Sequence, residues 1–154
     1  MLKRSWIDST SLKHLKCRKV NFLMTEEYAV PATGALILNE ENEIFLMKSP
    51  KWQNKWLVPG GKVEKGYSMK ETVKKEVKEE TGLKVRDLEF IEAKDGGNPD
   101  DFERDTHFIF LNFVCKAMNQ EVNLDEREAI EYIWISPEEA LESDLDINES
   151  TRDF

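Results

Sequence analysis

The feature that most constrains this chain is a short apolar segment that runs directly into a proline and two glycines. Residues 56–58 are Trp, Leu and Val, which favour a β-strand, and Pro59 removes a backbone hydrogen-bond donor immediately after them. Gly60 and Gly61 then permit backbone dihedrals that other residues rarely adopt. The sequence therefore predicts a strand that ends at a loop whose backbone is accessible.

A helix is predicted over residues 69–81, shortly after this loop. Ser68 and Glu71 have the spacing of a capping box, which satisfies free N–H groups at a helix N-terminus. Gly82 suits the left-handed position that follows a last helical turn. Apolar residues recur at every fourth position of the segment, at Met69, Val73 and Val77. This stripe predicts one face of the helix in the core and the opposite face in water.

The rest of the chain alternates strand-like and helix-like segments, which indicates a mixed α/β domain. Strands are predicted over residues 32–38, 44–48, 88–93, 106–117 and 132–135, the first two as a hairpin. Short helices are predicted after Ser136, where Pro137 follows, and near the end of the chain, where Asn148 or Ser150 would be the cap. A length of 154 residues with 40% hydrophobic content predicts one domain.

Charge and composition exclude several classes of protein. A formal net charge of −9 disfavours nonspecific binding to nucleic acids, because phosphates attract clustered basic side chains. The first residues lack the continuous apolar segment that is typical of a signal peptide, and no run of about 20 apolar residues could span a membrane. Cys17 and Cys115 have no neighbours at zinc-binding spacing and are expected to be free thiols. These features predict a cytoplasmic protein.

The first 24 residues differ from the rest of the chain in composition. They carry six Lys or Arg residues and one acidic residue, whereas the remainder has a net charge of −14. An organellar targeting segment, an interaction arm, or sequence upstream of a start at Met24 would each fit this composition, and we favour the last. The domain is expected to occupy residues 25–154, and its last helix is expected to extend beyond Phe154.

Three glutamates on one face of the predicted helix are the strongest candidates for chemistry. Glu76, Glu79 and Glu80 have i, i+3 and i+4 spacing, so their carboxylates lie side by side and repel one another. A solvated acidic face is the ordinary interpretation of such residues in an acidic protein. The glycine loop favours another interpretation, because its backbone can closely approach a cation or a phosphate. A hard divalent cation would relieve the repulsion, so we interpret this face as a metal platform.

At these positions the sequence resembles the Nudix box, over residues 61–83. The matching residues, in the order and spacing of the box, are Gly61, Glu76, Val77, Glu79, Glu80, Gly82 and Leu83. The resemblance implies a Nudix-type α/β/α sandwich with a mixed, curved sheet and a catalytic loop-helix-loop. It also implies a hydrolase that cleaves a diphosphate bond in a nucleotide-like substrate.

Two positions depart from the pattern of this family. Tyr67 stands where the box has its first glutamate, and Lys75 stands where it has an arginine. Lysine keeps the positive charge but loses the planar fork that orients carboxylates. Glu71 lies four residues before Lys75 and is placed to pair with it on the helix. We therefore expect a functional site whose activity these changes can reduce or alter.

The resemblance assigns metal binding to Glu76, Glu79 and Glu80, with the backbone carbonyl of Gly60 as a further ligand. Mg²⁺ is the expected cation and Mn²⁺ is the alternative. The cations would neutralise the diphosphate and lower the pKa of the attacking water, and Glu76 is the first candidate for the base.

In many members of the family, another glutamate outside the box completes the site. Glu126, Glu128 and Glu131 lie in a predicted loop before the last strand. We choose Glu128 among them, although a solvated loop residue explains any one of the three equally well.

Substrate contacts are expected from the glycine loop and from side chains near it. The candidates are Gly60, Gly61, Lys48, Trp52 and Arg104. The two basic residues would meet phosphate, and the tryptophan lies in a polar loop where it could stack on a base. The other aromatic residues of this region are expected mostly in the core: Trp56, Phe108 and Phe110.

The leading hypothesis is metal-dependent hydrolysis of a diphosphate bond in a nucleoside triphosphate or in a nucleoside diphosphate linked to another group, such as a sugar. The main alternative is a non-catalytic Nudix module that binds a nucleotide or a partner protein, which Tyr67 and Lys75 suggest. An acidic structural domain would leave the glycine loop and the spaced glutamates unexplained. The sequence is also compatible with a homodimer.

Overall fold

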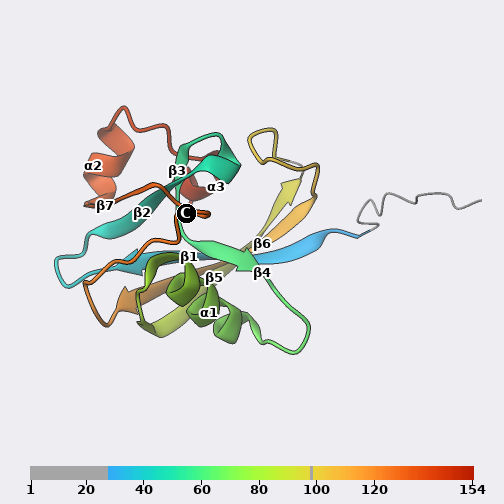
Figure 1. Cartoon of the computed structure of the whole chain (residues 1–154), viewed down its shortest axis with the longest axis horizontal. Helices are drawn as coiled ribbons and strands as arrows, with labels where there is room; N and C mark the ends of the chain where they lie inside the picture. The colour runs from blue at the N-terminus through green and yellow to red at the C-terminus, as the bar shows by residue number, and fades with distance from the viewer. Residues whose placement is uncertain (1–27, 98) are drawn as a thin grey trace, which may run out of the picture.

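A mixed sheet of seven strands organises the chain, and the computed structural model describes residues 28–97 and 99–154 (Figure 1). The strands are β1 (Val30–Leu38), β2 (Ile44–Ser49), β3 (Lys55–Leu57), β4 (Gly60–Lys62), β5 (Val85–Gly97), β6 (Phe108–Ala117) and β7 (Glu131–Ile135). The interpretations of residues 1–24, including a start at Met24, lie outside the described residues. No helix in the described residues is long and apolar enough to cross a membrane.

The central strand of the sheet is β1, which has partners on both edges. The main path of the sheet is β3-β2-β1-β6-β5, while β4 pairs with β1 and β7 pairs with β2. The β1–β6 pairing is parallel and the others are antiparallel. In the predicted hairpin, β1 and β2 pair only next to the connecting turn, where Leu38 faces Ile44. Because β6 covers one edge of β1, the other edge is shared between β2 and β4.

The strand β4 corrects the prediction that Gly60 and Gly61 form a loop. Both residues pair with β1, where Gly60 faces Gly34 and Gly61 faces Thr33. Neither glycine has a positive φ angle, so the unusual dihedrals expected here are not the reason for them. What requires glycine is close approach, because a Cβ atom on Gly60 would lie 1.9 Å from the carbonyl oxygen of Thr33.

The long helix α1 (Met69–Thr81) has the predicted bounds. The capping box is present, since Ser68 Oγ accepts from the Glu71 N–H and the Glu71 carboxylate accepts from the Ser68 N–H at 2.8 Å. Gly82 ends the helix in the left-handed conformation, with φ of 74°. The predicted apolar stripe is buried at Val73 and Val77 but not at its first position, because the first turn is exposed.

Three short helices complete the described elements. They are the 3-10 helix η2 (Pro50–Trp52), α2 (Pro137–Glu142) and α3 (Glu149–Arg152). Ser136 caps α2 in a capping box, and Asn148 caps α3 by accepting from the Ser150 N–H at 3.0 Å. Both helices were predicted, and the structure selects Asn148 over Ser150 as the cap.

Two hydrophobic clusters lie on opposite faces of the sheet. One contains Val73 and Val77 of α1 together with Phe45 of β2, and the other contains Leu46 of β2 together with Ala140 of α2. Adjacent residues of β2 thus point into different clusters, as the two-residue period of a strand requires. Figure 1 shows α1 below the strands and α2 above β2 and β7. The expected three-layer α/β arrangement with a mixed sheet is confirmed.

Candidate active site

A cavity of about 660 Å³ opens between β1, β4, the second half of α1 and the loops that follow β2, β5 and β6. Its acidic lining residues are Glu76, Glu79, Glu80, Glu103, Asp125 and Glu128. Its basic lining residues are Lys51, Lys62, Arg104 and Arg127. The structure therefore brings all three glutamates of the helix to the same cavity as Glu128, across 48 residues of sequence between Glu80 and Glu128.

The three helix glutamates have different environments. Glu80 is 6% exposed, and its Oε2 accepts a hydrogen bond of 2.9 Å from the Gly60 N–H. The side chain of Glu76 is 16% exposed and lies against Gly61, where a Cβ atom would be 2.3 Å from Glu76 Oε2. The side chain of Glu79 is 59% exposed. The pairing of β4 with β1 thus places backbone, and no side chain, against two of the three carboxylates.

Glu80 is the carboxylate whose ionisation is most strongly perturbed. Burial raises its pKa well above the usual range, and the hydrogen bond from Gly60 opposes this shift. The negative charges of Glu128 and Glu76 raise it further, whereas Lys51 lowers it. A cation close to Glu80 would oppose this shift and favour its charged form.

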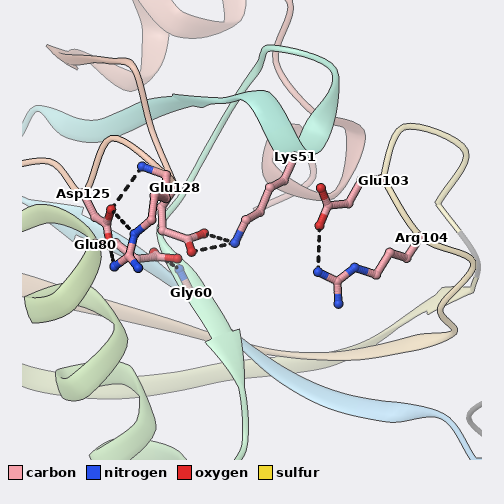
Figure 2. Close-up of polar contacts among 8 residues, drawn as sticks. Lys51, Gly60, Glu80, Glu103, Arg104, Asp125 and Glu128 are labelled. Carbon is pink, nitrogen blue, oxygen red and sulfur yellow. Dashed lines mark hydrogen bonds and ion pairs between the residues drawn. The ribbon is translucent and has the colours of Figure 1, made fainter.

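Glu128 reaches the cavity because the loop before β7 is attached to the end of α1. The Asp125 N–H donates to the Glu80 carbonyl oxygen at 2.9 Å, and the Glu128 N–H donates to the Asp125 carbonyl oxygen at 2.8 Å. The Glu128 carboxylate accepts from Lys51 Nζ at 2.5 and 2.6 Å. Figure 2 shows Lys51 pointing toward this group of acids from its own loop. Of the three candidate loop glutamates, only Glu128 lines the cavity.

Arg127 forms a forked ion pair beside this group. Its Nε and Nη2 atoms donate to Asp125 at 3.0 and 2.6 Å. The hydrogen bonds from the Arg127 side chain lower the pKa of Asp125 to about 2, so this carboxylate is charged at neutral pH. Arg127 is itself exposed at the rim of the cavity, where it can meet an anionic ligand.

Lys75 contacts three carboxylates, and Glu71 is not among them. Lys75 Nζ lies 3.0 Å from Glu79, 3.1 Å from Glu76 and 3.3 Å from Glu64. The hydrogen bonds with Glu79 and then Glu76 raise the pKa of Lys75. The expected Glu71–Lys75 pair is wrong, because the Glu71 carboxylate is held by Ser68 in the capping box.

The donor groups of the cavity have the chemistry that a hard divalent cation requires. Carboxylate oxygens come from Glu76, Glu79 and Glu80, and the backbone of Gly60 lies beside them. Within residues 28–97 and 99–154, however, no three such groups converge closely enough to hold a metal ion as they are placed. Lys75 engages two of the carboxylates, and Gly60 engages the third. Binding a cation would therefore require rotation of Glu76 and Glu79 away from the lysine.

Aromatic rings form another part of the cavity wall. Trp52 lies 4.6 Å from Phe102, 6.1 Å from Phe108 and 6.4 Å from Phe110, measured between ring centroids. Phe108 and Phe110 share a face of β6, as predicted, with their rings stacked at 5.4 Å. Phe108 is buried, as expected, whereas Phe110 is only half-buried, and both line the cavity without joining either hydrophobic cluster. Trp56 is buried in a cluster, as expected.

The two basic residues predicted to meet phosphate have different positions. Arg104 lies at the cavity beside Glu103, at 3.1 Å, and Figure 2 shows this pair apart from the Glu80–Glu128 group. Lys48 does not line the cavity, which corrects its assignment as a substrate contact. It pairs with Glu131 at 3.1 Å and lies over the Trp56 ring. The alternation of β2 explains this, because its neighbours Met47 and Ser49 are the ones that line the cavity.

Several cavity residues were not predicted from the sequence. They are Lys51, Phe102, Asn112, Asp125 and Arg127. Asn112 had a usable signal, because it is a polar residue in the middle of an apolar strand, and it is buried. The others lie in polar loops whose proximity depends on the tertiary fold.

Comparisons with known proteins identify the family of this chain. A family model described as NUDIX domain matches residues 29–154. The nucleoside triphosphatase NudI of Escherichia coli strain K12 is 29% identical over 98 residues, which cover 60% of this chain and 69% of that protein. The crystal structure of a MutT protein from Methanosarcina mazei Go1 is 31% identical, with a TM-score of 0.66, and covers 83% of this chain and 91% of that chain.

A MutT NUDIX hydrolase from Burkholderia pseudomallei shares the fold at lower identity. Its crystal structure is 19% identical, with a TM-score of 0.70 over 82% of this chain and 95% of that chain. The family model covers most of the chain, including the helix, the β4 strand before it and the loop that carries Glu128. The chain therefore belongs to the Nudix hydrolase family, whose members are pyrophosphohydrolases.

Proposed function

We propose that this chain hydrolyses a diphosphate bond in a nucleoside triphosphate or in a nucleoside diphosphate linked to another group. The observation that carries the proposal is one cavity with two unlike walls, carboxylates on α1 at one side and aromatic rings at the other. A phosphate chain needs cations, which carboxylates hold, and a base needs flat apolar surfaces. The NudI relative is named as a nucleoside triphosphatase, so nucleoside triphosphates are the first substrates to test.

Glu76, Glu79 and Glu80 would hold the cation, together with the Gly60 carbonyl. Family members use divalent metal ions, and we propose Mg²⁺ for this chain, with Mn²⁺ as the alternative. When bound, the cation would neutralise the diphosphate and lower the pKa of an attacking water. The buried position of Glu80 supports this assignment, because a partner of double positive charge compensates its desolvation.

The remaining polar groups have roles in positioning and in proton transfer. Glu76 is our candidate for the base that takes a proton from water, because it is largely buried and lies against the β4 backbone. Glu128 is the candidate from outside the helix, and Lys51 holds it in the cavity. Lys51, Arg104 and Arg127 would contact the phosphates that project from the metal site.

The aromatic wall would hold the base. Trp52 and Phe110 are half-buried and line the cavity, so one face of each is available for stacking. Trp52→Leu should raise KM for a nucleotide roughly tenfold, the size expected for loss of one stacking contact. Phe90→Leu is the matched control, because Phe90 is an exposed aromatic residue on β5 that does not line the cavity. Equal KM values in the two variants would show that the nucleotide base does not stack on this aromatic wall.

The function is tested by incubating the protein with nucleoside triphosphates, nucleotide sugars and dinucleoside polyphosphates, and identifying products by mass spectrometry. We expect hydrolysis of at least one class with Mg²⁺ or Mn²⁺ and none with EDTA. Saturable nucleotide binding without hydrolysis of any class would contradict the proposal. That result would instead support the non-catalytic module.

A further inference from the structure

The segment between β4 and α1 contains a turn whose two ends are Glu64 and Tyr67. The Tyr67 N–H donates to the Glu64 carbonyl oxygen at 3.1 Å, and Gly66 provides the positive φ angle, 95°, inside the turn. The Val63 N–H donates to the Pro31 carbonyl oxygen at 2.9 Å, which attaches the start of the turn to β1. Glu64 therefore has a defined position at the entry to the turn, three residues before the site where the box has a glutamate.

The Glu64 carboxylate is directed at Lys75. Its Oε1 lies 3.3 Å from Lys75 Nζ, which also contacts Glu76 Oε1 and Glu79 Oε2 at 3.1 and 3.0 Å. An ammonium group has three N–H donors, so each carboxylate can accept one of them. Only two of the three carboxylates line the cavity, because Glu64 lies outside it.

Lys75 contacts one oxygen of the Glu76 carboxylate, which a cation would need. One oxygen of Glu76 accepts from the lysine, and the other lies 2.3 Å from the position that a Cβ atom on Gly61 would occupy. Without Glu64, the ammonium would contact only Glu76 and Glu79 among these three carboxylates and would compete more strongly with a cation for their oxygens. Glu64 supplies an opposing attraction from outside the cavity.

We propose that Glu64 is a positioning residue that acts through Lys75 and supplies, from position 64, the carboxylate that the box has at position 67. This inference rests on the proposed function, since it assumes that Glu76 and Glu79 serve a cation. It also explains how the chain can have Tyr67 and Lys75 together with an intact set of helix glutamates.

The test compares Glu64→Gln, Tyr67→Glu, the double variant and the control Glu41→Gln in the full chain. Glu41 is exposed in the turn between β1 and β2, outside the cavity. The readouts are the Kd for Mn²⁺, measured by electron paramagnetic resonance without nucleotide, and kcat on any substrate found. Thermal unfolding of each variant reports on the fold.

We expect Glu64→Gln to weaken Mn²⁺ binding and to lower kcat by about tenfold each, as for other residues that orient metal ligands. Tyr67→Glu should restore both values in the double variant to within about threefold of the parent protein. The control should match the parent, and the melting temperature of Glu64→Gln should change by no more than about 2 °C.

Two results obtained with the variants would overturn the inference alone. Unchanged Mn²⁺ affinity in Glu64→Gln would show that Glu64 does not position the site, and failure of Tyr67→Glu to restore affinity would show that it does not replace the missing glutamate. A parent protein that binds Mn²⁺ but hydrolyses nothing would refute the proposed function alone, because the affinities remain measurable. A parent protein that does not bind Mn²⁺ would refute both.

Discussion

Among single residues, the helix glutamates show what a spacing pattern can predict, which is a shared face, and what it cannot predict, which is the burial of each side chain. The i, i+3 and i+4 spacing predicted that Glu76, Glu79 and Glu80 share a face, and the structure places all three at one cavity. Spacing could not predict that Glu80 would be buried while Glu79 stays exposed. That difference arises from β4, whose backbone covers one end of the face. Lys51 could not be found at all, because only the tertiary fold brings it to Glu128.

Replacement of Glu79 and of Glu80 by Gln should have the same effect on turnover but different effects on stability. Either change removes a charged cation ligand, so kcat should fall on the order of 100-fold or more. In the metal-free protein, Glu80→Gln should raise the melting temperature by about 2–4 °C, because burial penalises the ionised form of the Glu80 carboxyl and glutamine cannot ionise. Glu79→Gln should leave the melting temperature unchanged, because its side chain is exposed.

Steady-state kinetics and thermal unfolding without metal check this prediction. Glu41→Gln, in an exposed turn, serves as the control for loss of one negative charge. Full turnover in either helix variant would refute the site assignment. A lower melting temperature for Glu80→Gln would show that its charge stabilises the fold.

Among the structural elements, α1 was predictable because its signals are local. The Ser68 and Glu71 capping box and Gly82 lie within one turn of its ends, so the sequence determines the bounds directly. The strand β4 was not predictable, since it has only three residues and forms by pairing with β1 about 28 residues earlier. The same contrast applies to Phe108 and Phe110. Their shared face follows from strand alternation, but whether that face meets a core or a cavity depends on the surrounding loops.

Adjacent glycines of β4 should respond differently to alanine. A Cβ atom on Gly60 would lie 1.9 Å from the Thr33 carbonyl oxygen, so Gly60→Ala must separate β4 from β1. It should cost about 3 kcal/mol or more in the free energy of unfolding. A Cβ atom on Gly61 would instead meet the Glu76 side chain, which can move. Gly61→Ala should therefore cost about 1 kcal/mol or less but lower kcat by about 10- to 100-fold.

Chemical denaturation and steady-state kinetics on the two alanine variants separate these effects. The two variants are matched, because they add the same methyl group at neighbouring positions of one strand. A Gly61→Ala protein with parental kcat would show that the exact position of Glu76 does not matter. A stable Gly60→Ala protein would contradict the close pairing of β4 with β1.

In the molecule as a whole, the sheet separates two hydrophobic clusters, and residues of both clusters line the cavity, such as Met47 and Val58. The α/β class and the order of most elements followed from periodicity, because each strand and helix buries one face. The sheet order did not, since a parallel β1–β6 pair joins segments about 78 residues apart. The cavity depends on that pairing, because β1 and β6 both contribute to its wall.

The accessibility of Cys115 tests the integrity of this core. Burial raises the pKa of its thiol to about 12, so almost no thiolate forms near neutral pH. In a Cys17→Ser protein, Cys115 should react with a thiol reagent at about pH 8 only after unfolding. The measurement is the reaction rate with and without denaturant. Rapid reaction of the native protein would contradict a closed core around β6.

The central claim is that the helix glutamates hold a divalent cation in the cavity beside β4. The most direct test is anomalous diffraction from crystals of the protein soaked in Mn²⁺ with a non-hydrolysable nucleotide. We predict an anomalous peak bounded by Glu76, Glu79 and Glu80, with Lys75 turned away from them and the phosphates of the nucleotide on the opposite side of the metal. Bound nucleotide without a peak at these glutamates, or a peak elsewhere, would contradict the account.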